Sequence, residues 1–138
     1  MLLQFLLHVI GYDVWFYLSH RALHTRWLWW AHRIHHERAD PVWTDTYHGH
    51  WFETMFQSWG FFLPFAVGPV SWWIAGVALA FVNVRAMLHH DRRGTWLVGD
   101  YHLVHHRRPG VNFGQPWLDW LGGTGGRYPP LAERLYPP

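Results

Sequence analysis

The sequence predicts an all-α, membrane-embedded protein with an N-terminal apolar helix, a helical hairpin and a polar, histidine-rich head. Two apolar blocks, residues 1–18 and about 52–88, have the composition of helices in contact with lipid. No segment alternates apolar and polar residues over a useful length, which argues against strands. Aromatic residues make up 20% of the chain and include 12 Trp, a residue that favours the membrane–water interface.

The first element, residues 1–30, is expected to be a membrane helix that leads into a histidine motif. Its apolar run has four interruptions: Gln4, His8, Gly11 and Asp13. The run lacks the positive leading region and small-residue cleavage site of a signal peptide, so we expect it to remain in the protein. Trp27, Trp29 and Trp30 lie where the helix would leave the apolar phase.

The second block, residues 52–88, follows a polar segment in which Asp40-Pro41 ends any helix. Pro64, Gly68 and Pro69 interrupt this block, and each arm is near or below the ~20 residues of a straight spanning helix. A helical hairpin is therefore predicted, with a buried hairpin of a soluble protein as the alternative. Residues 89–124 form the histidine-rich C-terminal part, and residues 125–138 read as a loop-rich tail.

Composition excludes several functions. A chain of 138 residues is one domain, residues 1–138, without room for a redox module, so any electron donor is a separate protein. A net charge of +2 from scattered arginines does not form a nucleic-acid-binding surface. The absence of Cys excludes thiolate metal sites and Fe–S clusters, so a metal would be bound by nitrogen and oxygen ligands.

Ten of the 13 histidines fall into four short groups. The groups are His20 and His24; His32, His35 and His36; His89 and His90; and His102, His105 and His106. Side chains four apart on a helix share a face and lie ~6 Å apart along the axis. In a HxxHH motif the adjacent pair diverges by ~100°, so one triplet can serve two metal ions.

Clustered imidazoles are costly to bury unless they are neutral or bind metal, although any single group could instead be a polar helix face. Eight or nine nitrogen ligands are too many for one ion, which indicates two. Imidazole suits iron, zinc, copper and nickel, so ligand type alone leaves the metal open. Soluble di-iron bundles need Glu-x-x-His pairs, and this chain offers only Asp45-Thr-Tyr-His48.

Five segments together resemble the fatty acid hydroxylase superfamily, also called the sterol desaturase family, whose members are integral-membrane non-haem di-iron enzymes. These segments are residues 13–24, 30–36, 102–106, 112–114 and the closing Trp117-Leu-Asp-Trp-Leu-Gly-Gly-Thr124. The resemblance therefore extends over nearly the whole chain.

The resemblance implies eight metal-binding and catalytic histidines: His20, His24, His32, His35, His36, His102, His105 and His106. In the third family motif His90 is the better candidate ligand and catalytic residue, and His89 is second. Arg85 or Ala86 stands where many relatives have another His, so water, substrate or His50 is left to complete the site. Hydrogen-bond acceptors for the outer imidazole nitrogens are expected among Asp91, Asp100 and Asn112, with Asp13 and Glu53 as weaker choices.

The resemblance also implies a function. Two iron ions, for which zinc can substitute in a purified sample, would use O₂ to hydroxylate or desaturate a lipid-like substrate such as a fatty acyl chain, sterol or carotenoid. The alternative is a non-catalytic, metal-binding membrane protein. Arginine-rich segments beside the apolar blocks predict that the histidines face the cytoplasm. Members commonly have about four membrane-crossing helices, whereas this chain supplies one N-terminal helix and a hairpin. Either the N-terminal anchor is abbreviated, or a partner subunit completes it. The expected partners include membrane lipids and a second copy of the chain in a homo-oligomer.

Overall fold

The computed structural model describes residues 1–126, and within them helices are the only extended regular elements, which confirms the all-α prediction. Residues 127–138, most of the predicted tail, lie outside the described residues. The long elements are α1 (Leu2–Leu23), α3 (Trp51–Ser58) with the 3₁₀ helix η3 (Trp59–Ala66) that continues it, and α4 (Trp72–His89). The short elements are α2 (Trp29–His32), η1 (His35–Glu37), η2 (Trp43–Tyr47), η4 (Arg92–Gly94), α5 (Thr95–Val98), α6 (Tyr101–Arg107) and α7 (Pro116–Gly122).

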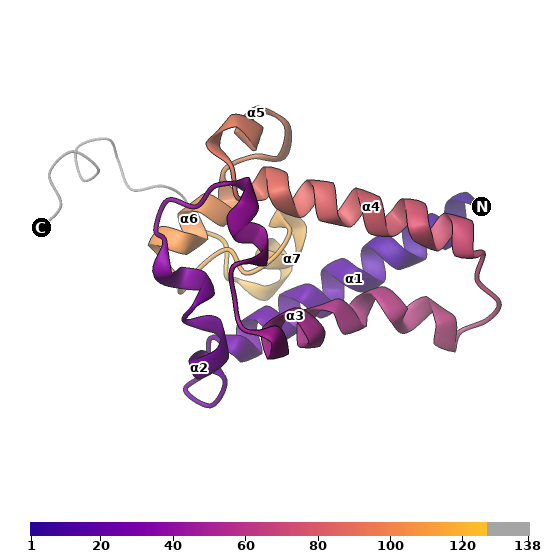
Figure 1. Cartoon of the computed structure of the whole chain (residues 1–138), viewed down its shortest axis with the longest axis horizontal. Coiled ribbons are helices and arrows are strands. Elements are labelled where there is room, and N and C mark those ends of the chain that lie inside the picture. Colours follow the sequence, from indigo (N-terminus) through magenta and orange to yellow (C-terminus); the bar gives the residue numbers. More distant parts are fainter. Residues whose placement is uncertain (127–138) are drawn as a thin grey trace, which may run out of the picture.

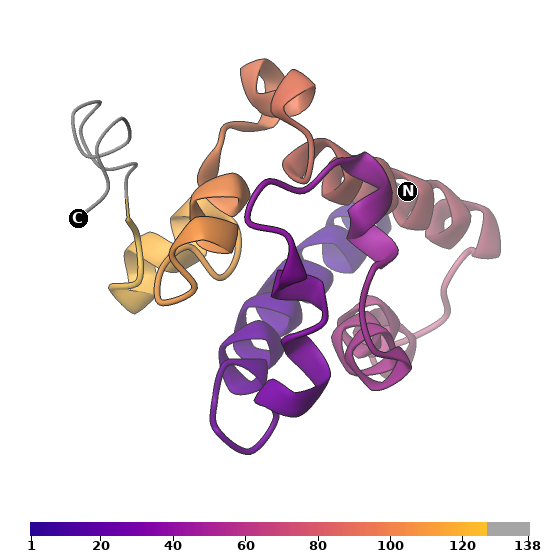
Figure 2. The ribbon, with the colours of Figure 1, turned by 60° about the vertical axis from the view of Figure 1, so that its left-hand side comes forward.

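The long helices extend to one side of the molecule and the short ones form a head at the other (Figure 1). Helices α1 and α4 run toward the head, and the arm made of α3 and η3 runs away from it, as the predicted hairpin requires. Figure 2 shows α6 and α7 on one side of α1 and the arm on the other. The C-terminal ends of α1 and α4 therefore both reach the head.

Two helices, α1 and α4, are long and apolar enough to cross a membrane. Only 28% of the apolar window of α1 and 22% of that of α4 is buried inside the protein. Helices that are apolar on most faces and largely exposed fit contact with lipid better than the core of a soluble protein. Helix α1 ends at Leu23 rather than near residue 30, because the amide and hydroxyl of Thr25 both bond to the carbonyl of Ala22.

Polar side chains on α1 bind backbone carbonyls of the arm and the loop after it. His8 Nδ1 donates to the carbonyl of Phe61 at 2.9 Å, and Trp15 Nε1 donates to that of Phe56 at 2.6 Å. Pro64 has no N–H, so it cannot be the 3₁₀ donor to the Phe61 carbonyl three residues before it. His8 supplies that donor where lipid offers none, and Gln4 likewise donates to the carbonyl of Pro69.

A second polar link joins α1 to α4. Asp13 is buried and forms an ion pair with Arg85, one of the two residues considered for the position of a further family histidine. Both charges lie within the two helices that are long and apolar enough to cross a membrane, an environment in which each would need a partner of opposite sign. The pair holds the two helices together just below the head.

Close packing of α1 against η3 depends on a glycine. A Cβ on Gly60 would lie 2.4 Å from the Cβ of Trp15, whereas a Cβ on Gly76 of α4 would meet nothing within 4 Å. We expect Gly60→Ala to lower the free energy of unfolding by about 1–3 kcal/mol, because the arm must move away from α1. Gly76→Ala should be neutral or stabilising, since Ala favours helix over Gly by up to ~1 kcal/mol. Thermal unfolding in detergent measures both, and equal midpoints for the two variants would contradict this packing.

Candidate metal centre

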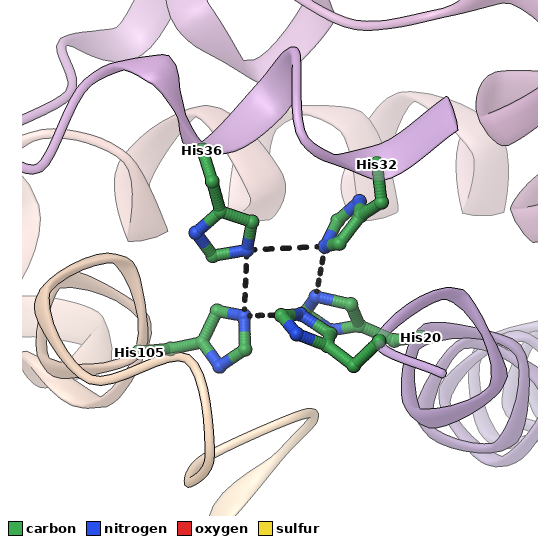
Figure 3. Close-up of side chains that lie close together, drawn as sticks. His20, His32, His36 and His105 are labelled. Atoms are coloured by element: carbon green, nitrogen blue, oxygen red, sulfur yellow. Dashed lines mark hydrogen bonds between the residues drawn. The ribbon is translucent and has the colours of Figure 1, made fainter. Parts of the chain in front are cut away.

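Five imidazoles converge between α1, α2, η1 and α6, and we call them the five-histidine group. Its members are His20, His24, His32, His36 and His105, and one ring nitrogen from each lies within 4.8 Å of all the others. The Nε2 atoms of His20 and His32 are 2.9 Å apart, and those of His36 and His105 are 3.1 Å apart. Figure 3 shows the rings of His20, His32, His36 and His105 turned toward a common point.

Four more imidazoles, all buried, form the four-histidine group beside the first. Its members are His35, His90, His102 and His106, again with one nitrogen each within 4.8 Å of the others. His90 Nε2 lies 3.1 Å from that of His35 and 3.0 Å from that of His102. His106 Nε2 is buried without a hydrogen-bond partner. The two groups together contain nine histidines.

Local helix geometry divides the HxxHH motifs between the groups. His32 and His36 are one turn apart and enter the five-histidine group, whereas His35 points to the other. In α6 the division is reversed, because His105 enters the five-histidine group and His102 and His106 enter the four-histidine group. Adjacent histidines therefore serve different groups, as their divergence on a helix predicts.

Backbone carbonyls orient five of the nine rings from behind. Each of these rings donates its Nδ1–H to a carbonyl, which leaves Nε2 as a bare lone pair when the ring is neutral. In the five-histidine group His20 bonds to Phe113 at 2.5 Å and His105 to Val111 at 2.6 Å. In the other group His35 bonds to His48 at 3.0 Å, His106 to Arg38 at 3.0 Å and His90 to Ala86 at 2.8 Å.

The contact between His35 and His90 tests whether the groups suit a cation. Both rings use their Nδ1 proton on a carbonyl, so two lone pairs face each other across 3.1 Å. Burial opposes a shared proton, because it lowers the pKa of His35 to about 4 and that of His90 to about 3. A metal cation between such nitrogens removes the repulsion, so the donor set fits one.

A buried carboxyl group lies behind one ring of the five-histidine group. Glu53 Oε1 lies 2.9 Å from His32 Nδ1, and both side chains are nearly inaccessible to solvent. Burial raises the pKa of the Glu53 carboxyl to about 8 and lowers that of His32. An acceptor behind a ligating imidazole fixes its ring orientation. Glu53, a weaker choice from sequence, lies behind His32, but His32 Nδ1 forms no hydrogen bond with it.

The structure keeps two candidate histidines out of both groups. His50 caps the start of α3, where its Nδ1 accepts the amide of Phe52 at 3.1 Å. His89 Nε2 lies 3.4 Å from the side-chain nitrogen of Gln115 and belongs to neither group. Of the three residues that compete for the last position, His90 is the one that joins a group.

The three acceptors expected from sequence also bind elsewhere. The Asp91 carboxylate holds the backbone and side chain of Arg93. Asp100 supplies its backbone carbonyl to the first turn of α6, and the Asn112 amide bonds to the carbonyl of Tyr101. Proximity in sequence did not identify the acceptors, because most of them are backbone carbonyls. Every residue has one, so the residue type does not reveal which carbonyl accepts the bond.

An open cavity of about 990 Å³, its mouth included, reaches the histidines from between α1, α3 and α4. Its inner end exposes three members of the four-histidine group but only His20 of the other. Tyr47, Asn83 and Gln57 contribute polar atoms to the lining, and Phe16 and Val82 contribute apolar surface. The four-histidine group therefore contributes more of the cavity lining than the five-histidine group does.

Comparison with known proteins places this arrangement in a family. The model of the fatty acid hydroxylase family matches residues 5–124. A very-long-chain aldehyde decarbonylase of Oryza sativa subsp. indica is 32% identical over 88% of this chain and 52% of its own length. A methylsterol monooxygenase of Arabidopsis thaliana is 29% identical over 88% of this chain and 52% of its own length. A Delta(7)-sterol 5(6)-desaturase of Gibberella zeae is 32% identical over 88% of this chain and 37% of its own length.

The chain spans about half the length of the first two of these relatives and about a third of the third. No solved structure matches it significantly. The family match covers both HxxHH motifs, the HxxxH motif and the closing Trp-Leu-Asp-Trp segment in one alignment. The chain belongs to the fatty acid hydroxylase family.

Proposed function

We propose that each histidine group binds one iron ion and that the protein oxidises a C–H bond of a lipid-like substrate with O₂, by hydroxylation or desaturation. The observation that carries the proposal is the convergence of nine imidazole nitrogens, several of them lone pairs without a proton to share. Bound iron would supply the activation of O₂ that removal of hydrogen from an unactivated carbon requires. The relatives named as a monooxygenase and a desaturase support this reaction class.

The protein's own part is to hold nitrogen donors and to shape the approach to them. Carbonyls behind His35, His90 and His106 fix these rings, so little reorganisation is needed when an ion binds. Three members of the same group line the cavity, so an ion held by them would be accessible from between α1, α3 and α4. A bound chain or ring would fill this space and exclude water from the reacting carbon.

The apolar surfaces of α1 and α4 support an integral-membrane location, with the head at the cytoplasmic face by the positive-inside rule. A lipid-like substrate would then enter from the membrane in which these helices lie. Electrons would come from a separate donor protein. The substrate class is proposed to be sterol, fatty acyl or another membrane-soluble molecule, in keeping with the names of the relatives.

Replacing one histidine in each group tests the assignment of ligands. We expect His35→Ala and His105→Ala each to lower bound iron from about two ions per chain toward one after dialysis, because each group loses a fixed donor. His50→Ala is the matched control, since that ring caps α3 and should leave iron content unchanged. Elemental analysis of purified protein measures the ratio. Full iron content in both test variants would show that these rings are not ligands.

Lipid mass spectrometry tests the reaction. Lipids from cells with and without the protein should differ in a species that has gained one oxygen atom or lost two hydrogen atoms. The purified, iron-loaded protein with its reductant should consume O₂ only when that substrate is present. Tightly bound zinc, without O₂ uptake or any lipid change, would instead support a non-catalytic metal-binding protein.

Acid should destabilise the metal-free protein. Burial lowers the pKa of His24 and His35 to about 4 and that of His90 to about 3, against about 6.5 in an unfolded chain. Between these values the unfolded state binds more protons, so stability falls as pH decreases from about 6.5 to about 4. Thermal unfolding at several pH values measures this effect. A midpoint that is constant over the range would mean that these rings are not buried in the neutral form.

A further inference from the structure

Two buried aspartates, Asp45 and Asp119, are not used by the proposed reaction, although each is less than 7% exposed. Both carboxylates accept hydrogen bonds from backbone amides of a neighbouring loop. Each loop in turn provides carbonyls that orient histidines. The two aspartates act on different groups of histidines.

Asp119, in the closing Trp-Leu-Asp-Trp segment, braces residues 111–114. Its two carboxylate oxygens accept the amides of Phe113 at 2.8 Å and Gly114 at 2.9 Å. The hydroxyl of Thr124 donates to the same carboxylate at 2.7 Å, and the carbonyl of Thr124 accepts the amide of Asn112 at 2.8 Å. Asn112 has a φ of 59°, a left-handed conformation that this network stabilises.

The braced loop serves only the five-histidine group. The carbonyl of Phe113 accepts His20 Nδ1, and that of Val111 accepts His105 Nδ1. These two carbonyls are on either side of Asn112 in the chain, so the conformation of one turn determines where both point. Asp119 therefore controls two of the five rings without approaching the metal position.

Asp45 has the corresponding place for the four-histidine group. Its carboxylate accepts the amide of Val42 at 2.9 Å and the guanidinium of Arg38 at 3.0 Å, and its carbonyl accepts the amide of His48. The carbonyl of Arg38 accepts His106 Nδ1, and the carbonyl of His48 accepts His35 Nδ1. One aspartate thus fixes both ends of the segment that orients two of the four rings.

We propose that Asp119 and Asp45 are positioning residues with separate targets, Asp119 for the ion in the five-histidine group and Asp45 for the ion in the four-histidine group. This inference rests on the proposed function, because it requires two bound ions. Groups that orient metal-ligating imidazoles typically change metal affinity by 10–100-fold when removed. Asparagine keeps the size of the side chain but replaces one acceptor oxygen with an N–H donor, which would face a backbone amide.

Cobalt(II) titration of the metal-free, full chain in detergent, under anaerobic conditions, tests the proposal. Wild-type protein should bind two cobalt ions, each with its own visible spectrum. Asp119→Asn should lower the affinity for one ion by about 10–100-fold and leave the spectrum and affinity of the other unchanged. Asp45→Asn should show the reverse pattern. Asp40→Asn, in an exposed carboxylate paired with Arg92 and Arg107, is the matched control and should leave both ions unchanged.

Double variants identify which ion each aspartate controls. Asp119→Asn combined with His105→Ala should still bind one cobalt ion tightly, because both changes affect the same group. Asp119→Asn combined with His35→Ala should bind none tightly. Thr124→Val removes the hydroxyl that bonds to Asp119 and to Tyr17, with little change of shape. It should weaken binding of the same ion by a smaller factor, and it carries the test if Asp119→Asn does not fold.

The outcomes distinguish failure of the proposed function from failure of the positioning role of the two aspartates. Fewer than two cobalt ions in wild-type protein would overturn the proposed function. A different result would overturn only the present inference: wild-type protein binds two ions, and Asp119→Asn or Thr124→Val lowers the affinity for both equally or for neither. The proposed function would remain intact. Circular dichroism and tryptophan fluorescence must match wild type for each variant, so that loss of one ion is not a sign of unfolding.

Discussion

The main physical constraint on the structure is the mutual repulsion of imidazole lone pairs in the head. Five of the nine clustered rings direct their only proton to a backbone carbonyl, so their Nε2 atoms are acceptors, and those of His35 and His90 face each other without a donor. Such an arrangement is unfavourable in a buried site unless a cation occupies its centre. Burial also lowers the pKa of rings such as His90, which prevents protons from taking that role. The proposed metal binding would therefore stabilise the head.

The apolar part of the chain delivers these rings to one place. Helix α1 carries His20, α4 ends beside His90, and the arm between them brings Glu53 behind His32. The polar residues of α1 have partners there, since His8 and Trp15 satisfy carbonyls of the arm and Asp13 pairs with Arg85. The apolar helices and the head therefore form one packed unit.

Sequence reasoning identified the helical class, the hairpin and the division of each HxxHH motif, because helix periodicity determines all three. It did not identify what orients the rings. Nearness in sequence suggested Asp91, Asp100 and Asn112. The acceptors are instead backbone carbonyls such as those of Phe113 and Val111. Every residue has a backbone carbonyl, so the residue type does not show which one accepts the bond. It also left open which of His50, His89 and His90 completes the metal site. Only the fold shows that His50 caps α3 and that His90 alone of the three reaches a group.

X-ray absorption at the iron edge of the iron-loaded protein tests the central claim most directly. The account predicts a first shell dominated by nitrogen, with the multiple scattering of four to five imidazoles per iron, because it divides nine rings between two ions. A first shell dominated by oxygen, with one or two imidazoles per iron, would contradict the account. Such a result would mean that the converging rings are not the iron ligands.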